Sequence, residues 1–257
     1  MRIVSLVPSL TLSLFDLGLD ASSVVGRTPW CIHPADAVDR VPVVGGTKTP
    51  NLGKIAASEP DVVVMDRDEN PKAVHDWCIE QGYQTFVCHV RHPAEVPEML
   101  RGLGRTVKRE TEAEAMASRL ETTLTALPEP NGRVALPLIW HEPLMAANGA
   151  TYAGNMVACM GYEVPVIEPE GTGYPVVTPE SIMAWRVNDL FLSSEPHEFS
   201  LEEGERLVAA IEALGGTPPA LHLIDGEALT WMGSFTDKGL DDLLAMEERL
   251  RADRTLM

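Results

Sequence analysis

The sequence has few basic residues for its size. Lysine and arginine together number 20 among 257 residues, against 38 aspartates and glutamates, so the formal net charge is -18. A surface this negative repels the phosphates of nucleic acids and the headgroups of anionic lipids. Neither nucleic acid nor an anionic membrane surface is therefore expected as a partner.

Long apolar runs are also missing. No stretch approaches the ~20 apolar residues that a membrane-spanning helix needs, so no membrane insertion is expected. No secretory leader is visible, because residues 2–7 already have the pattern of a strand and no cleavage site follows a long apolar stretch. Two locations stay open: periplasmic if a leader was removed and Met1 added, cytoplasmic if Met1 is the native start.

Cysteine is scarce and irregularly spaced. Cys31, Cys78, Cys88 and Cys159 form no C-x-x-C pair, so reduced, buried thiols are expected in place of a disulfide framework. The H-E-x-x-H motif of zinc hydrolases and the G-x-S-x-G elbow of serine hydrolases are absent. No catalytic residue, no intrinsic cofactor and no protein-bound metal site is therefore predicted.

The apolar residues that are present alternate between short strand-like runs and helical periodicity, which is typical of α/β proteins with parallel sheets. In the first part of the chain we expect strands at 2–7, 23–26, 41–44, 61–65 and 84–88. Between them we expect helices at 10–18, 52–58, 71–81 and 93–104.

One long amphipathic segment interrupts this alternation. Residues 106–127 place Ala113, Met116 and Leu120 on one stripe, and Pro128 ends the pattern. A long helix followed by a breaker predicts a connection between two lobes.

The opening pattern then returns. Arg2-Ile3-Val4 is echoed by Arg133-Val134-Ala135, and a glycine closes the next helix in each half, Gly18 and Gly161. We therefore predict an α/β fold of two Rossmann-like lobes with parallel sheets joined by one long α-helix. The predicted domains are an N-terminal lobe at 1–105, the connecting helix at 106–128 and a C-terminal lobe at 129–257.

Ligands of open α/β sheets bind beyond the carboxyl ends of the strands. In the first lobe these ends lead into the loops 27–34, 45–50, 66–70 and 89–93. In the second lobe they lead into 140–148, 172–175, 194–199 and 225–234. If the two lobes face each other, these loops line one cleft.

Aromatic residues are few, with five tryptophans, four tyrosines and five phenylalanines, yet several lie in these loops. They either plug a core or meet a large, flat, partly apolar ligand. The loop aromatics are Trp30, Trp140, Tyr174, Phe199 and Trp231. Five of the seven histidines lie there too. They either contact a metal or a polar group of the ligand, or they are solvated side chains without such a role. These histidines are His33, His89, His92, His141 and His197.

The stretch T-P-W-C-I-H-P at 28–34 illustrates the choice. Its two prolines stiffen the loop, which suits a preformed surface. Trp30 is expected to stack on the ligand, His33 to make a polar or axial contact, and Cys31 to be structural. Lys48 follows a glycine pair that lacks the full phosphate-loop pattern and is interpreted as a tight turn with donors facing the ligand.

Six stretches together resemble class III periplasmic binding proteins, the helical-backbone metal receptors, and most of all their cobalamin-binding-protein-like branch. In the first half they are I-V-S-L-V-P-S-L-T at 3–11, V-V-G-G-T-K-T-P at 43–50 and E-P-D-V-V-V at 59–64. In the second half they are L-I-W-H-E-P-L-M at 138–145, L-S-S-E-P at 192–196 and D-G-E-A-L-T-W-M-G-S at 225–234.

The resemblance implies two lobes, a rigid connecting helix, a cleft for a metal chelate and delivery to an ABC importer permease. Family members dock to the permease through one glutamate on each lobe, and Glu69 and Glu195 are the nearest candidates here. The two glutamates follow equivalent strands of the two lobes, which suits a symmetric docking point. The other interpretation is that each is an acid near a helix N-terminus, which the helix dipole favours.

We therefore expect a monomeric solute-binding protein that holds a metal chelate for ABC import: cobalamin or another corrinoid first, then haem or an iron-siderophore. The expected ligand contacts are Trp30, His33, Lys48, Trp140, His141, Tyr174, His197 and Trp231. Two alternatives stay open. One is a cytoplasmic corrinoid or metal-handling protein of the same fold without transport, and the other is an enzyme that uses the cleft.

Overall fold

The structure, a computed structural model, describes residues 1–167 and 173–256. The chain forms two compact units. Unit 1 consists of Met1–Val90, Ala94–Thr122 and Met232–Phe235. Unit 2 consists of Arg91–Pro93, Thr123–Trp231 and Thr236–Met257. Among the described residues no helix is both long and apolar enough to cross a membrane.

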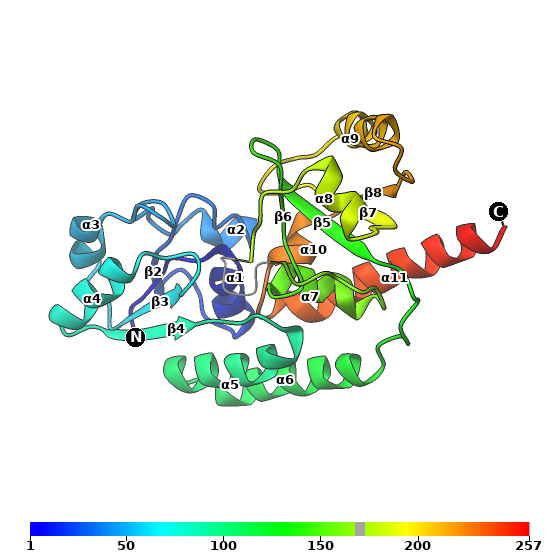
Figure 1. The fold of residues 1–257 in the computed structure, drawn as a ribbon. Coiled ribbons are helices and arrows are strands. Elements are labelled where there is room, and N and C mark those ends of the chain that lie inside the picture. The colour runs from blue at the N-terminus through cyan, green and yellow to red at the C-terminus, as the bar shows by residue number, and fades with distance from the viewer. Residues whose placement is uncertain (168–172, 257) are drawn as a thin grey trace. The chain divides into compact units, whose positions relative to one another are not determined.

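Unit 1 is built on a parallel sheet of four strands in the order β2-β1-β3-β4 (Figure 1). Its strands are β1 (Ile3–Ser5), β2 (Val24–Gly26), β3 (Val62–Asp66) and β4 (Gln84–Cys88). Its helices are α1 (Pro8–Asp16), α2 (Ala35–Val38), α3 (Leu52–Ala57), α4 (Lys72–Glu80), α5 (Val96–Val107, after the 3₁₀ turn η1 at Pro93–Glu95) and most of α6 (Glu110–Thr125).

Burial distinguishes an inner strand of this sheet from an edge strand. All five residues of β3 are buried, as expected for a parallel strand covered on both faces, whereas β4 at the edge is buried only at Cys88. Val63 and Met65 of β3 pack with Ile55 of α3 and Cys78 of α4 in one apolar cluster. Apolar residues spaced for a strand and apolar residues spaced for helices therefore pack in one core on this face of the sheet.

The strand predicted at 41–44 is wrong. Only an isolated bridge joins Arg27 to Val43 there. Pro42 has no N–H to extend a ladder, and the chain turns at Gly45, which has a φ of 114°. The apolar residues of this segment are therefore only partly used for pairing.

The helix predicted over 106–127 begins later, at Glu110, because α5 continues to Val107. The backbone of Lys108 has the left-handed conformation, with a φ of 58°, and this residue ends α5. The two helices then pack closely, since a side chain at Gly104 would collide with the Cβ atom of Ala113. The two helices therefore form a helical hairpin.

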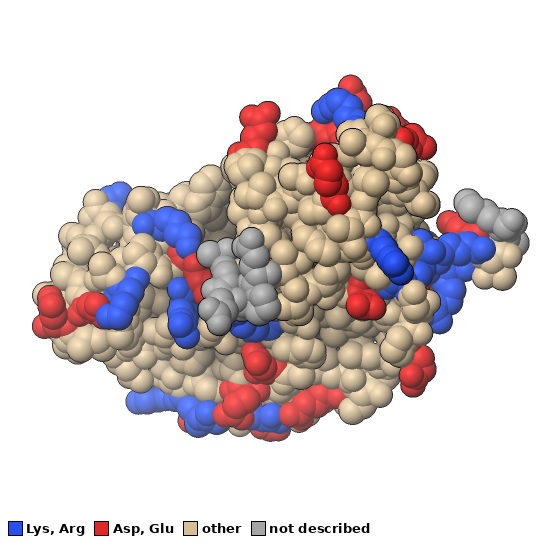
Figure 2. Space-filling view, in the orientation of Figure 1, with Lys and Arg blue, Asp and Glu red and all other residues tan. Residues whose placement is uncertain are grey.

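Ion pairs hold the outer side of this hairpin. Arg101 of α5 forms bidentate contacts with Glu114 and Glu121 of α6, with N–O distances of 2.6–3.0 Å. Figure 2 shows basic and acidic side chains alternating along the edge that α5 and α6 form. Because these groups are exposed, their contribution to stability is modest.

Unit 2 repeats the four-stranded arrangement in the order β6-β5-β7-β8 (Figure 1). Its strands are β5 (Ala135–Trp140), β6 (Met145–Ala146), β7 (Asp189–Ser193) and β8 (Ala220–Ile224). They pair in parallel except β6, which is antiparallel to β5. The helices are α7 (Tyr152–Cys159), α8 (Pro179–Ala184), α9 (Leu201–Ala213), α10 (Gly226–Thr230) and α11 (Phe235–Leu256, shared with unit 1 at its start). The predicted α/β class with two sheets is confirmed.

Both faces of the second sheet are covered. Leu190 and Leu192 of β7 pack with Ile182 of α8 and Ile211 of α9. On the other face, Phe191 meets the ring of Tyr162 edge-on, with 5.4 Å between centroids. The hydroxyl of Tyr162 donates to the buried carboxylate of Glu247 on α11 over 2.6 Å.

The internal repeat predicted from the sequence appears in matching elements. Gly18 follows α1 and Gly161 follows α7, with φ values of 82° and 91° that an L side chain rarely adopts. The central strands β3 and β7 are each buried at all five residues. The two halves therefore share a core plan although their edge strands differ.

Candidate functional site

The loop after β2 presents an exposed tryptophan on a fixed base. The indole of Trp30 is 66% exposed, whereas the neighbouring Cys31 is completely buried. The Cys31 sulfur lies 3.1 Å and 3.2 Å from the hydroxyls of Thr11 and Thr28. Arg27 donates to the carbonyls of Thr28 and Cys31 at 3.2 Å. The loop is thus anchored from below, and the indole is available for contact.

The four cysteines are all free and buried, as predicted. Cys31 lies inside the loop base described above, where its sulfur contacts the hydroxyls of Thr11 and Thr28. His33, two residues further on, is half-buried. Within one short stretch, the side chain of Cys31 is therefore enclosed and that of His33 is partly accessible.

The loop after β3 is organised by a buried carboxylate. One oxygen of Asp66 accepts hydrogen bonds from the N–H groups of Asp68 and Glu69, at 2.8 and 3.0 Å, and the other faces the Cys88 thiol at 3.3 Å. Burial raises the pKa of the Asp66 carboxyl above its usual range, against these hydrogen bonds. Lys48 is exposed and donates to the carbonyl of Asp68. Lys48 and Glu69 thus share one edge of the first sheet.

In unit 2 the carboxyl ends of β5 and β7 carry a cluster of rings. His141 and His197 stack, with centroids 5.4 Å apart and planes 15° from parallel. Phe199, which is buried, meets the His197 ring edge-on at 4.6 Å. Trp140 remains 43% exposed and approaches His197 at 6.4 Å between centroids. Because β5 and β7 are neighbours in the sheet, residues far apart in sequence meet here.

A carboxylate from α9 completes this cluster. Oε1 of Glu203 lies 3.0 Å from Nε2 of His197 and 3.7 Å from Nδ1 of His141. Its other oxygen accepts from the backbone N–H of Ser200, whose hydroxyl in turn accepts from the N–H of Glu203, forming a capping box. The Ser200 backbone hydrogen bond and the His197 contact lower the pKa of Glu203 to about 2.

Glu203 is not among the residues predicted from the sequence to contact a ligand. The pattern S-x-x-E at 200–203 marks the start of a helix, and it directly follows a loop of the predicted binding edge. That signal could have placed a carboxylate near the edge, but it could not have shown which histidines the carboxylate faces.

Trp231 occupies a different environment from the other two edge tryptophans. It is only 6% exposed, and its indole N–H donates to Oε1 of Glu195 over 2.9 Å. Thr230 donates to the same oxygen over 3.0 Å. Burial raises the pKa of Glu195, against these two hydrogen bonds. The predicted loop 225–234 is partly helical, because it contains α10, which ends at Thr230 and leads directly into Trp231.

Tyr174 is half-buried and lies at the edge of the described residues. The predicted loop 172–175 falls partly outside them, because residue 172 is not described. Of the remaining edge histidines, His89 faces Asp68 at 3.4 Å.

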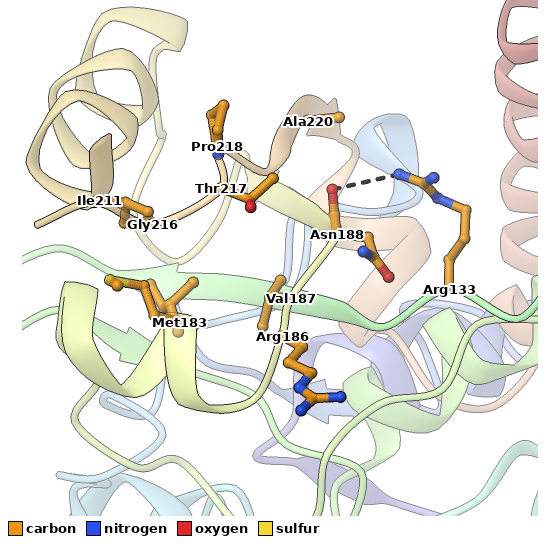
Figure 3. Close-up of a pocket in the computed structure, with 12 residues that line it drawn as sticks. Arg133, Met183, Arg186, Val187, Asn188, Ile211, Gly216, Thr217, Pro218 and Ala220 are labelled. Atoms are coloured by element: carbon orange, nitrogen blue, oxygen red, sulfur yellow. Dashed lines mark hydrogen bonds between the residues drawn. The ribbon is translucent and has the colours of Figure 1, made fainter. Parts of the chain in front are cut away.

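A cavity of about 700 Å³ lies at the opposite end of the second sheet (Figure 3). Arg133 precedes β5 and Asn188 precedes β7, and Arg133 donates to the carbonyl of Asn188 over 3.4 Å. None of the predicted ligand contacts lines this cavity. Open parallel sheets bind ligands beyond the carboxyl ends of their strands. This larger cavity lies at the amino ends, so its volume alone does not make it the candidate ligand site.

A smaller cavity of about 210 Å³ lies on the side of the ring cluster. His141 and Glu203 form part of its wall, together with Phe199. Its other lining residues are Leu138, Leu144, Leu192, Gly204, Arg206 and Leu207. The lining is mostly apolar and includes three ionisable side chains, His141, Glu203 and Arg206.

Comparison with known proteins agrees with this architecture. Residues 3–222 match the family model described as periplasmic binding protein. No curated protein sequence matches the chain.

Several solved structures share the fold. A periplasmic heme-binding protein RhuT from Roseiflexus sp. RS-1 is 19% identical, with a TM-score of 0.76 over 96% of this chain and 97% of that one. The periplasmic vitamin B12 binding protein BtuF of Vibrio cholerae is 15% identical, with a TM-score of 0.74 over 97% of both chains. The periplasmic heme-binding protein HutB of Vibrio cholerae is 20% identical, with a TM-score of 0.75 over 97% and 98%. At these identities the likeness shows the fold.

Proposed function

Because the chain belongs to the periplasmic binding protein family, in its class III branch, we propose that it is a solute-binding protein that carries a metal chelate of corrinoid or haem type to an ABC importer. The similar structures are described as binding vitamin B12 or heme. Both ligands are large, flat macrocycles around a metal. The proposal places the protein in the periplasm with its relatives and assigns it a binding role.

One observation carries the proposal: each unit presents an exposed tryptophan at the carboxyl edge of its own sheet. Trp30 is 66% exposed and Trp140 is 43% exposed. A single exposed apolar side chain needs no explanation, but two indoles at the edge where such sheets bind ligands do. An indole offers a flat apolar face that suits stacking on a macrocycle.

The remaining contacts in the proposal are polar. His33, Lys48 and Tyr174 are accessible or half-buried near the loop ends, and His141 and His197 stand beside Trp140. They suit the carboxylate or amide side groups of a tetrapyrrole, or an axial position on its metal. We propose that Trp231 supports the other contact residues, since its indole is buried and donates a hydrogen bond to Glu195.

For docking to the importer we propose Glu69 in unit 1 and Glu195 in unit 2. Glu69 lies in the turn that Asp66 organises, so its backbone position is well defined. Glu195 is half-buried, and one of its oxygens accepts from both Thr230 and Trp231. A docking surface that depends on a carboxylate fixed in this way would lose function on a neutral replacement.

The binding proposal is tested by titrating the protein with cyanocobalamin, cobinamide, haem and a ferric siderophore while following tryptophan fluorescence. Quenching by one of these at micromolar concentration is expected, and the order of affinities identifies the ligand. Absence of quenching by all four would refute the proposal.

The docking proposal needs a separate measurement. Glu69→Gln and Glu195→Gln are expected to bind the chelate as the unchanged protein does but to lower importer-dependent uptake in reconstituted vesicles. Unchanged uptake by both variants would rule out docking through these two residues.

A further inference from the structure

Three side chains in unit 2 bring metal-ligating atoms together at one point. They are His141 after β5, His197 after β7 and Glu203 on α9, and one donor atom of each lies within 4.8 Å of the other two. The sequence contains no spacing that predicts this group, because the three residues come from separate elements. Strand pairing between β5 and β7 creates it.

The distances suit a small cation. Ligands at 2.0–2.1 Å from a tetrahedral ion lie about 3.3 Å from one another. Oε1 of Glu203 is 3.0 Å from Nε2 of His197 and 3.7 Å from Nδ1 of His141, on either side of that value. The rings now stack within 15° of parallel, so one imidazole must rotate about its broad terminal torsion to aim its lone pair at the shared point.

One of the three donor atoms lacks a hydrogen-bond partner within the described part of the chain. Nδ1 of His141 is buried and has no hydrogen-bond partner among the described residues. Such an atom is costly to bury unless something binds it. By contrast, Glu203 is held firmly by the capping box with Ser200 and carries a negative charge toward both rings.

We propose that His141, His197 and Glu203 bind a bare divalent first-row transition-metal ion, of which Zn²⁺ is the probe. Two imidazoles and one carboxylate are a donor set that such ions accept, and three protein ligands leave at least one position open. The apolar cavity of about 210 Å³ shares His141 and Glu203 with the cluster. Water or a small anionic ligand there completes the coordination.

This site is distinct from an axial contact to a metal chelate. A tetrapyrrole occupies four coplanar positions of its metal and leaves two axial positions on opposite sides. Three protein donors clustered within 4.8 Å cannot all reach those two positions. The inference therefore goes beyond the proposed function, and it gives His141 and His197 a role different from the chelate contacts proposed above.

The experiment uses the full chain after treatment with a chelator. Isothermal titration with Zn²⁺ measures affinity, and Co²⁺ substitution reports imidazole and carboxylate ligation through its visible absorption. His141→Gln, His197→Gln and Glu203→Gln are each expected to weaken Zn²⁺ binding by roughly 100-fold, at least as much as the loss of an outer-sphere partner costs. Glu203→Gln is the most informative, since glutamine at this position retains the capping box.

His75→Gln is the matched control, because His75 is a half-exposed histidine on α4 of unit 1. It is expected to leave Zn²⁺ affinity unchanged. Thermal unfolding of each variant without metal checks that the fold is intact, and if one histidine variant unfolds, Glu203→Gln decides. The proposal is overturned if the unchanged protein binds no Zn²⁺ at micromolar concentration, if Glu203→Gln binds like the unchanged protein, or if His75→Gln weakens binding equally. Chelate titrations without Zn²⁺ test the proposed function separately.

Discussion

Replacing Trp30 with alanine removes the most exposed large apolar side chain on the proposed binding edge. The indole is 66% exposed. With roughly 250 Å² for a whole tryptophan, about 160 Å² is accessible, and stacking on one face covers about half of that. At ~25 cal/mol per Å², the lost contact is about 2 kcal/mol, which raises the chelate Kd by roughly 30-fold.

The assay follows the absorption of the bound chelate, because tryptophan fluorescence would itself change with the substitution. Ile79→Ala is the matched control: Ile79 is 54% exposed on α4 of the same unit, away from the carboxyl edge. The control is expected to leave Kd unchanged, and neither variant should alter the free energy of unfolding by more than ~0.5 kcal/mol. An unchanged Kd for Trp30→Ala, or an equal loss in Ile79→Ala, would refute the stacking argument.

Three further predictions follow from the same structure. Trp140→Ala, at 43% exposure, is expected to raise the chelate Kd by roughly tenfold by the same area argument, as measured by calorimetric titration. Cys31→Ser is expected to keep chelate affinity and to lower the free energy of unfolding by about 1 kcal/mol in urea, because a hydroxyl replaces a fully buried thiol; lost binding in a folded variant would contradict its structural role. Asp189→Asn is expected to lose about 2 kcal/mol of stability at neutral pH, since the buried carboxylate pairs with Arg133 at 2.6 Å and His222 at 2.8 Å. Although burial opposes it, these partners keep the pKa of Asp189 below its usual 3.8. Its stabilisation is therefore present above pH 3.8 and lost as pH falls through the lowered pKa, so the gap between Asp189→Asn and the unchanged protein should narrow below pH 3.8.

Local patterns were sufficient for most of the fold. The run of apolar residues in β3 and β7 predicts strands covered on both faces, and the structure buries all five residues of each. The repeated glycines Gly18 and Gly161 predict two matching helix ends, and both have positive φ. Such signals work because secondary structure and backbone conformation depend strongly on the residues within a few positions, and a continuous apolar run is compatible only with burial.

Errors arose where one or two residues interrupted a longer apolar pattern. The segment 41–44 has strand-like residues but makes one bridge, because Pro42 cannot donate and Gly45 turns the chain. The helix predicted from 106 starts at Glu110, because α5 ends at the left-handed Lys108 and packs against α6. The amphipathic pattern alone does not show where one helix stops and its partner begins.

The sequence by itself determined that the chain is an acidic α/β protein with a repeated plan, aromatic residues in its loops and free cysteines. Tertiary structure decided what those loop residues do. Trp30 is exposed and Trp231 is buried against Glu195, although both are loop tryptophans by pattern. His141, His197 and Glu203 meet only because β5 and β7 are adjacent, since the order of strands in a sheet, and not their spacing along the chain, sets which loop ends converge.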